Sequence, residues 1–419
     1  MEKHNQLTGR HARAFMLLCA MVYFTSYLTR TNYTAVILEL TGALGITKSE
    51  AGLISTIAFF TYGAGQLVSG FVGDKIYPRR LIAFGLAATS VCNFSMSACG
   101  SIAPMAVIWG VNGLCQAMFW PPLVRLMAEN LNDDNYSTAC VWVSVGSSFG
   151  TIGVYLACPL LIKLGGWRLV FIAAGICGIL MTALWLIASG KLLKNRIREN
   201  VRTDDDAAPA ATGGIGAAGF GVLAAVCLAI VLQGILRDGV TTWMPVLVSE
   251  QFGLPTGASI LTGLALPVFS MISFNLAGWL QKKLHSEMIC SILLFGVAAG
   301  SALVLRIFGF SGNKSVVTTA VSVLLMSVLT GCMHGINLML VSRIPSYFMK
   351  FGRISTISGV VNAFTYVGSA ISSFWFAALT ERAGWGVTVL SWLAIALAGC
   401  VVCIVIRPVW EKYKREKLS

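Results

Sequence analysis

The sequence predicts an all-α membrane protein with twelve transmembrane helices in two six-helix halves. Hydrophobic residues make up 56% of the chain, charged residues only 11%, and the mean hydropathy is +0.78, unlike soluble globular domains. Apolar runs of about 20 residues or more, each able to cross ~30 Å of hydrocarbon as a helix, recur along the chain. The twelve runs are roughly 12–36, 50–73, 80–100, 103–127, 136–162, 168–190, 217–247, 254–280, 287–308, 315–341, 353–380 and 386–407.

The basic charge is distributed as expected for membrane topology. The formal net charge is +13. With the N-terminus placed in the cytoplasm, twenty-one Lys and Arg residues fall on the inner side and six on the outer side. This asymmetry predicts that both termini are cytoplasmic in a multi-pass protein of the cell (inner) membrane. It also argues against a nucleic-acid partner. The first apolar run is too long for a signal-peptide core and is expected to be retained.

One polar segment divides the chain. Residues 191–216 begin basic, pass through an Asp cluster and end in Ala, Pro and Gly, which is typical of a linker. We therefore expect a six-helix half at 1–190, a cytoplasmic linker at 191–216 and a second half at 217–419. The halves also repeat a pattern, because each has a Ser-Thr pair followed at the same spacing by a Gly-Trp pair. These pairs are Ser137-Thr138 with Gly166-Trp167, and Ser355-Thr356 with Gly384-Trp385.

Two arginines lie inside apolar runs, Arg30 in the first helix of the first half and Arg237 in the first helix of the second. An arginine in hydrocarbon costs several kcal/mol and stays charged, so it needs an anionic partner or a wet cavity. The acidic residue nearest to Arg30, Glu39, is more than two turns away. Asp238 adjoins Arg237, but helix neighbours point ~100° apart, so we expect it to be a poor partner. A bound anion is the expected partner of both arginines.

Polar side chains form stripes on the otherwise apolar helices. Lipid cannot satisfy their hydrogen bonds, so such stripes should face a cavity, although single Ser and Thr residues often serve only to join helices. The stripes are Tyr23, Tyr27, Arg30 and Thr34; Tyr62, Gln66 and Ser69; Gln233, Arg237 and Thr241; Thr330, His334 and Asn337; and Asn362, Tyr366 and Ser369.

Phosphate fits two arginines well. The guanidinium fork donates paired, charge-assisted hydrogen bonds, and a phosphate monoester carries about −1.5 to −2 near neutral pH. Two arginines therefore balance one phosphoryl group almost completely, and nearby tyrosine hydroxyls can donate to its other oxygens.

Three motifs resemble the organophosphate:phosphate antiporters of the major facilitator superfamily. They are Tyr23-x-x-x-Tyr27-x-x-Arg30, the run Gln116-Ala-Met-Phe-Trp120-Pro121-Pro122-x-x-Arg125, and Arg237-Asp-Gly239 followed by Trp243-x-Pro245. The resemblance extends from about residue 15 to the end and is strongest in the first half. It implies two parallel six-helix repeats, alternating access, and exchange of a phosphorylated small organic anion for inorganic phosphate.

The resemblance also implies site residues. Arg30 and Arg237 would bind the phosphate, and the other expected substrate-binding residues are Tyr23, Tyr27, Tyr62, Gln66, Gln116, Trp120, His334, Asn337 and Tyr366. A cytoplasmic gate is expected at Asp74, Lys75, Arg79 and Arg80, within a segment similar to the family's loop motif.

Three positions depart from the glycerol-3-phosphate exchangers. Gly146 replaces a site histidine in the fifth helix, Gln66 replaces a lysine, and His334 stands where a tyrosine is expected. These differences make glycerol-3-phosphate itself a doubtful substrate. His334 has a second interpretation, as a hydrogen-bonded packing residue.

Two other functions stay open. One is a carrier of another organic anion, a carboxylate or phosphonate, coupled to protons through Asp238 or His334. The other is a transporter-like membrane sensor of a sugar phosphate. No Ser-His-Asp constellation, His-rich metal cluster or Gly-rich phosphate loop is found in the sequence, so an enzyme, a cofactor and a metal are not expected. The expected partners are the small anion, phosphate and the bilayer, and the chain is expected to be monomeric.

Overall fold

The computed structural model describes residues 6–72, 77–193, 217–312, 314–345, 347 and 354–418, and the regular structure in these residues is helical throughout. The helices are α1 (Gly9–Leu44), α2 (Lys48–Val72), α3 (Pro78–Ala98), α4 (Ile102–Gln116), α5 (Trp120–Asn130), α6 (Asp133–Leu192), α7 (Ala217–Phe252), α8 (Thr256–Thr262), α9 (Ala265–Leu284), α10 (Glu287–Phe308), α11 (Val316–Asn337), the wider turn η2 (Leu338–Arg343), α12 (Ile354–Tyr413) and η4 (Lys414–Leu418).

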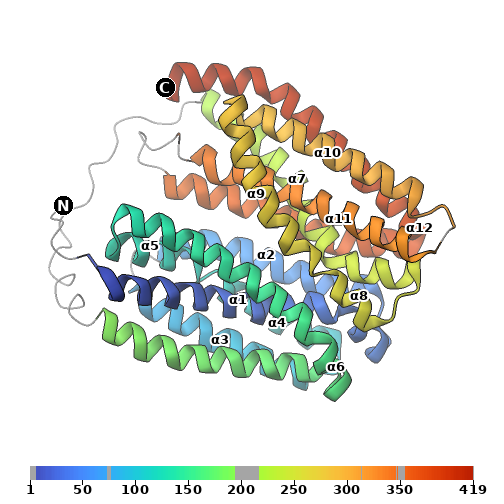
Figure 1. Cartoon of the computed structure of the whole chain (residues 1–419), viewed down its shortest axis with the longest axis horizontal. Coiled ribbons are helices and arrows are strands. Elements are labelled where there is room, and N and C mark those ends of the chain that lie inside the picture. Colours follow the sequence, from blue (N-terminus) through green and yellow to red (C-terminus); the bar gives the residue numbers. More distant parts are fainter. Residues whose placement is uncertain are drawn as a thin grey trace. The chain divides into compact units, whose positions relative to one another are not determined.

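Ten segments of the described residues are long and apolar enough to cross a membrane, and two of them cross twice. The helices α6 and α12 have 60 residues each, a length of about 90 Å if they were straight, three times the hydrocarbon thickness. Each is broken at a glycine with positive φ, Gly166 (φ 67°) in α6 and Gly384 (φ 78°) in α12, a conformation that glycine adopts without strain. The chain reverses there (Figure 1). The twelve predicted helices are therefore present, and the repeated Gly-Trp pairs mark the two reversals.

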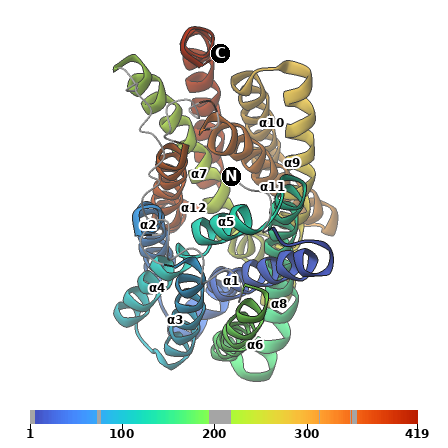
Figure 2. The same ribbon diagram turned by 90° about the vertical axis from the view of Figure 1, so that its left-hand side faces the viewer.

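The helices form two compact units. Unit 1 comprises 1–36 and 64–210, and unit 2 comprises 37–63 and 211–419. Helices α1 and α2 contribute to both, because their segments that adjoin the α1–α2 turn belong to unit 2. In unit 1, α3 packs against α4 and α6. In unit 2, α12 packs against α7 and α10, and α11 packs against α9 and α10 (Figures 1 and 2).

Glycines bring α6 against α1 in unit 1. A β-carbon at Gly146 would lie 2.5 Å from the carbonyl oxygen of Ala20, and one at Gly150 would lie 2.5 Å from that of Phe24. These positions are four residues apart, so they lie on one face of α6. Such a small-residue face lets two helix backbones approach closely within a membrane.

The same approach occurs between α12 and α7 in unit 2. A β-carbon at Gly368 would lie 2.2 Å from the carbonyl oxygen of Val231, and one at Gly234 would lie 2.2 Å from that of Thr365. Phe24 precedes Arg30 by six residues, and Val231 precedes Arg237 by six. In each half, a glycine of the neighbouring helix therefore contacts the arginine-bearing helix six residues before the arginine.

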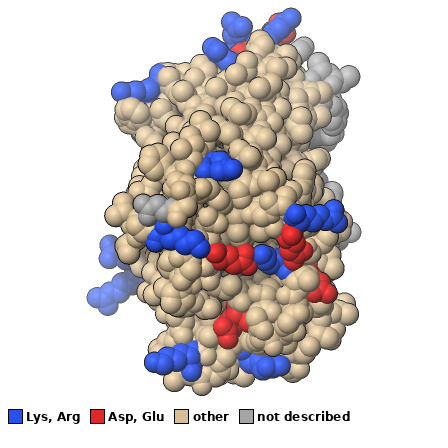
Figure 3. Space-filling model, turned by 90° about the vertical axis from the view of Figure 1, so that its right-hand side faces the viewer, with Lys and Arg blue, Asp and Glu red and all other residues tan. Residues whose placement is uncertain are grey.

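A salt bridge and a hydrogen bond connect the start of α2 to other helices of unit 2. Lys48 Nζ lies 2.8 Å from Glu250 Oε2, which also accepts a 2.8 Å hydrogen bond from Trp385 Nε1. The backbone N–H of Ser49 donates to Glu381 Oε1 at 3.0 Å. On the face drawn in Figure 3, some acidic side chains lie directly beside basic ones, while other basic side chains stand apart.

The first helical turns of α3 and α10 carry different anchors. In unit 1, Arg79 donates to Ser189 Oγ and to the carbonyl of Leu186, both at 2.7 Å. In unit 2, Glu287 is fully buried and accepts from Lys414 Nζ at 3.2 Å, from Gln281 Nε2 at 2.9 Å and from the Tyr347 hydroxyl. Burial raises the pKa of the Tyr347 hydroxyl, which favours its protonated, hydrogen-donating form.

Candidate substrate site

Unit 1 contains an aromatic cluster beside Arg30. The Arg30 guanidinium carbon lies 4.3 Å from the centre of the Tyr27 ring. The Tyr23 ring is 5.6 Å from Tyr27 and 5.4 Å from Trp120 on α5, measured between ring centres. The predicted stripe on the first helix is thus one contiguous group, and it includes Trp120 from the helix-four motif. A cation over an aromatic face is stabilised by the ring quadrupole.

Gln66 and Gln116 in unit 1 are buried. Gln116 Nε2 donates to the Ser26 carbonyl at 3.1 Å and to Thr29 Oγ1 at 2.9 Å, which joins α4 to α1 directly before Arg30. Gln66 lies on α2, and its Nε2 has no hydrogen-bond partner within the described part of the chain. A buried donor of this kind is costly to leave unsatisfied, so Gln66 has the capacity to donate to a bound group.

In unit 2, Arg237 is paired with its sequence neighbour. Its Nε and Nη2 donate to the two carboxylate oxygens of Asp238 at 2.8 and 2.7 Å. Ser369, on α12, donates its hydroxyl hydrogen to the same carboxylate. The expectation that Asp238 is a poor partner is therefore wrong. The long arginine side chain can bend back to the short aspartate even though their Cα–Cβ bonds diverge, and Ser369 holds the carboxylate in that position.

Tyr62 and Tyr366 join the Arg237 cluster. The two rings are 4.3 Å apart between centres, and the Tyr366 ring centre is 5.6 Å from the Arg237 guanidinium carbon. Tyr62 belongs to the part of α2 that packs in unit 2. Residues from three different helices, α2, α7 and α12, thus form one contiguous group that includes Arg237.

His334 and Asn337 lie on the same side of α11, near this cluster. His334 is half-buried and stacked on Phe274, with ring centres 5.8 Å apart and an interplanar angle of 14°. Arg237 and Asp238 are close enough to act on it electrostatically. One residue before it, the Met333 carbonyl accepts a 3.0 Å hydrogen bond from Gln233 Nε2, which joins α7 to α11. Asn337 Nδ2 is buried without a hydrogen-bond partner among the described residues.

The expected cytoplasmic gate is described only in part. Asp74 and Lys75 lie outside the described residues. Arg79 is half-buried and bonded to the end of α6, whereas Arg80 is exposed. Within the described ranges, no three His, Cys, Asp or Glu side chains are grouped so as to bind a metal ion.

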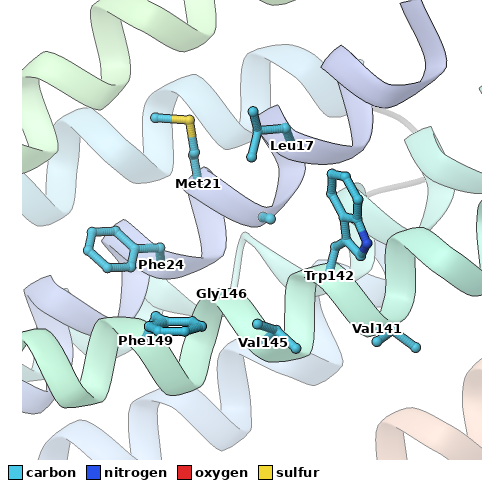
Figure 4. Close-up of a pocket in the computed structure, with 9 residues that line it drawn as sticks. Leu17, Met21, Phe24, Val141, Trp142, Val145, Gly146 and Phe149 are labelled. Atoms are coloured by element: carbon cyan, nitrogen blue, oxygen red, sulfur yellow. The ribbon is translucent and has the colours of Figure 1, made fainter. Parts of the chain in front are cut away.

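An apolar groove of about 440 Å³ lies between α1 and α6 in unit 1 (Figure 4). It is lined by Leu17, Ala20, Met21, Phe24, Val141, Trp142, Val145, Gly146 and Phe149. None of these side chains carries a charge, so the groove is unsuited to an anion. Gly146 is part of its lining, and no side chain fits there because the Ala20 carbonyl is too close. The glycine noted at this position in the sequence thus permits the close contact between α6 and α1.

The chain belongs to the Major Facilitator Superfamily. The superfamily model matches residues 19–373, most of the chain, including both arginines and both glycine-mediated helix contacts. This membership, together with the helices described above, establishes a multi-pass membrane protein of the twelve-helix fold.

The relatives confirm the resemblance to the organophosphate:phosphate antiporters. A probable hexose phosphate transport protein of Chlamydia pneumoniae is 32% identical over 42% of this chain and 37% of its own length. The membrane sensor protein UhpC of Salmonella typhimurium is 27% identical over 41% of this chain and 40% of its own. Sugar phosphate exchanger 3 of Gallus gallus is 22% identical over 80% of this chain and 74% of its own. The match to the hexose phosphate transport proteins thus spans less than half of their length.

Solved transporters share the fold. A POT family transporter in complex with 5-aminolevulinic acid superposes with a TM-score of 0.75 at 12% identity, covering 94% of this chain and 96% of that one. At this identity the likeness concerns the architecture alone.

Proposed function

We propose that this chain is a secondary active transporter that exchanges a phosphorylated small organic anion for inorganic phosphate by alternating access. The observation that carries the proposal is the arginine at a matching place in each half. Arg30 and Arg237 each follow by six residues a carbonyl that a glycine of a neighbouring helix approaches. Phosphate fits the guanidinium fork, and two such arginines would balance its charge.

The proposed binding residues fall into two groups. Arg30 and Arg237 bind the phosphate, supported by the aromatic rings that contact each guanidinium. The remaining proposed members are Tyr23, Tyr27, Trp120, Gln66 and Gln116 from unit 1, and Tyr62, Tyr366, His334 and Asn337 from unit 2. Gln66 and Asn337 are supported by their buried amide groups, whose nitrogens lack partners among the described residues. The names of the sugar phosphate and hexose phosphate relatives support the phosphorylated substrate.

A membrane sensor of a sugar phosphate is the second candidate, because a sensor protein is among the relatives. A sensor and an exchanger can share a binding site and differ in whether the anion crosses. Counterflow separates them. Proteoliposomes loaded with unlabelled phosphate should accumulate labelled phosphate from outside and should lose that label when hexose phosphates are added outside.

The outcome of counterflow distinguishes three functions. Binding of a sugar phosphate without counterflow supports the sensor. Uptake of carboxylates or phosphonates driven by a pH gradient, without phosphate exchange, supports a proton-coupled carrier. Exchange of phosphate against organic phosphates, independent of a pH gradient, is the result expected here.

We place both termini and the 191–216 linker in the cytoplasm and propose a monomeric carrier of the inner membrane. Cysteines introduced singly at Lys3, Thr212 and Ser419 should resist an impermeant thiol reagent added to intact cells, compared with the unsubstituted chain. Labelling above that background at any of these positions from outside would contradict the orientation.

A further inference from the structure

Arg237 already holds an anion that belongs to the protein. Asp238 occupies Nε and Nη2 of the guanidinium with two hydrogen bonds of 2.8 and 2.7 Å. The pair is largely buried, with 12% of the Arg237 side chain and 16% of the Asp238 side chain exposed. The carboxylate therefore takes two donors on one edge of the fork, the arrangement in which a phosphate would bind.

The position of Asp238 is fixed by helix packing. Gly368 brings the α12 backbone against Val231 of α7, and Ser369, the next residue, donates to the Asp238 carboxylate. On the α7 side, a β-carbon at Gly239 would lie 2.7 Å from Ser372 Cβ. The close approach of these two backbones thus places a serine hydroxyl where it can hold the carboxylate on Arg237.

The sequence of the first half has no acidic residue next to its arginine that would correspond to Asp238. The residues within one helical turn of Arg30 are uncharged, whereas Arg237 is followed directly by an aspartate. The two arginines therefore differ in a way that their matching backbone positions do not explain.

We propose that Asp238 acts as an internal substitute for the anionic group of the substrate. In the empty carrier it occupies Arg237, the incoming phosphate displaces it, and it returns to Arg237 when the phosphate leaves. Ser369 keeps the displaced carboxylate close by. Asp238 is thus a positioning residue that lowers affinity and speeds release, which an exchanger needs in order to turn over. This inference rests on the proposed function, because it takes phosphate to be the displacing anion.

The test compares inorganic phosphate binding and exchange by the purified full-length chain in proteoliposomes. Asp238→Asn removes the competing charge but keeps the side-chain shape. Phosphate would then no longer have to break the charge-assisted contact between Asp238 and Arg237. We therefore expect Asp238→Asn to bind phosphate about tenfold more tightly. The exchange rate at saturating phosphate should fall, since nothing then displaces the phosphate from Arg237.

Two serine variants complete the design. Ser369→Ala removes the hydroxyl that holds Asp238 and should weaken the competitor, which tightens phosphate binding by a few-fold. Ser373→Ala is the matched control, because its hydroxyl donates to the Ser369 carbonyl at 2.9 Å rather than to Asp238. It should leave phosphate affinity at the wild-type value. If Asp238→Asn does not fold, the comparison of the two serine variants decides.

The possible results separate this inference from the proposed function. If wild-type protein shows no phosphate exchange, the proposed function fails before any variant is compared. If wild-type protein exchanges phosphate and Asp238→Asn binds it with equal or lower affinity, the substitute role is overturned. A selective loss of affinity for organic phosphates in Asp238→Asn also overturns it, since Asp238 would then be a direct acceptor for the organic part. Tighter phosphate binding with slower exchange supports it.

Discussion

Arg30 and Arg237 stand at matching places in two similarly packed helices, but their surroundings differ. Arg30 lies over the Tyr27 ring, next to a second tyrosine and Trp120. Arg237 is held by Asp238, with Tyr366 at its side. The backbone arrangement has been kept in both halves, and the side chains around the cation have diverged.

The glutamine contacts show the same divergence. In unit 1, Gln116 of α4 donates to a carbonyl of α1, whereas in unit 2, Gln233 of α7 donates to a carbonyl of α11. In both halves a glutamine amide thus joins the arginine helix to a neighbouring helix, but the glutamine lies on the neighbouring helix in unit 1 and on the arginine helix itself in unit 2. Either placement of the glutamine joins the two helices. Helix packing therefore places little constraint on which side chains surround each arginine. We expect the two halves to respond alike to changes in packing and differently to changes in charge.

The largest expected effect on transport comes from the arginines themselves. Arg30→Lys and Arg237→Lys keep the charge but lose the paired fork, and losing a bidentate contact costs about 1.5–3 kcal/mol or more, at least tenfold in affinity. Both variants should lose phosphate counterflow. Near wild-type exchange by either variant, shown to be folded by its elution profile, would contradict the proposed role of that residue.

The anchors at the starts of α3 and α10 should differ in strength. Lys414→Met leaves the fully buried Glu287 without its cationic partner, and breaking a buried ion pair costs about 3–5 kcal/mol. Arg79→Met removes two hydrogen bonds but leaves no buried charge behind, because the acceptors, Ser189 Oγ and the Leu186 carbonyl, are neutral, so a smaller loss of stability is expected. Thermal unfolding of the purified proteins should therefore show a larger drop in Tm for Lys414→Met. An equal or smaller drop than in Arg79→Met would show that Lys414 is not what compensates Glu287.

The overall fold was predictable from the sequence because each of its signals is local. Apolar run length indicates a membrane span, and the Gly-Trp pairs indicated a repeat whose glycines turned out to be the reversals in α6 and α12. The stripe on the first helix was also predictable, since helical periodicity alone puts Tyr23, Tyr27 and Arg30 on one face.

The pairing of Arg237 with Asp238 was not predictable in this way. Helical periodicity gives the direction of Cβ atoms, whereas the pair depends on how the long arginine side chain bends and on a serine from another helix. Ser369 was recognisable as part of a polar stripe, but its partner depends on how closely α12 approaches α7. That distance is set by Gly368, whose role becomes clear only from the Val231 carbonyl opposite it. Tertiary contacts of this kind leave no periodic signal.

Matched glycine substitutions test the shared backbone arrangement. Gly150→Ala in unit 1 and Gly368→Ala in unit 2 would each place a methyl group within 2.5 Å of a backbone carbonyl oxygen. Such overpacking costs about 1–3 kcal/mol, so both variants should unfold at lower temperature than wild type. Gly296→Ala is the control, since a β-carbon there meets nothing within 4 Å, and it should leave the Tm unchanged or slightly raised.

A difference in Tm between Gly150→Ala and Gly368→Ala would show that the two halves are packed differently. If only one of them is destabilised, the two arginine helices are not held equivalently, and the common placement of Arg30 and Arg237 would lose its structural basis.

The smallest expected effect concerns His334, for which stacking and substrate binding make opposite predictions. The ring is stacked on Phe274, so a packing role depends on its face, whereas a binding role depends on the nitrogens at its edge. His334→Phe keeps the ring and loses the nitrogens, and His334→Gln keeps a polar donor and loses the ring. One hydrogen bond to the substrate is worth about 1 kcal/mol, or roughly fivefold in affinity. We expect His334→Phe to bind phosphate about fivefold more weakly and His334→Gln to remain close to wild type in the same exchange assay. The reverse order, with His334→Phe unaffected and His334→Gln impaired and less stable, would assign His334 to packing and remove α11 from the proposed site.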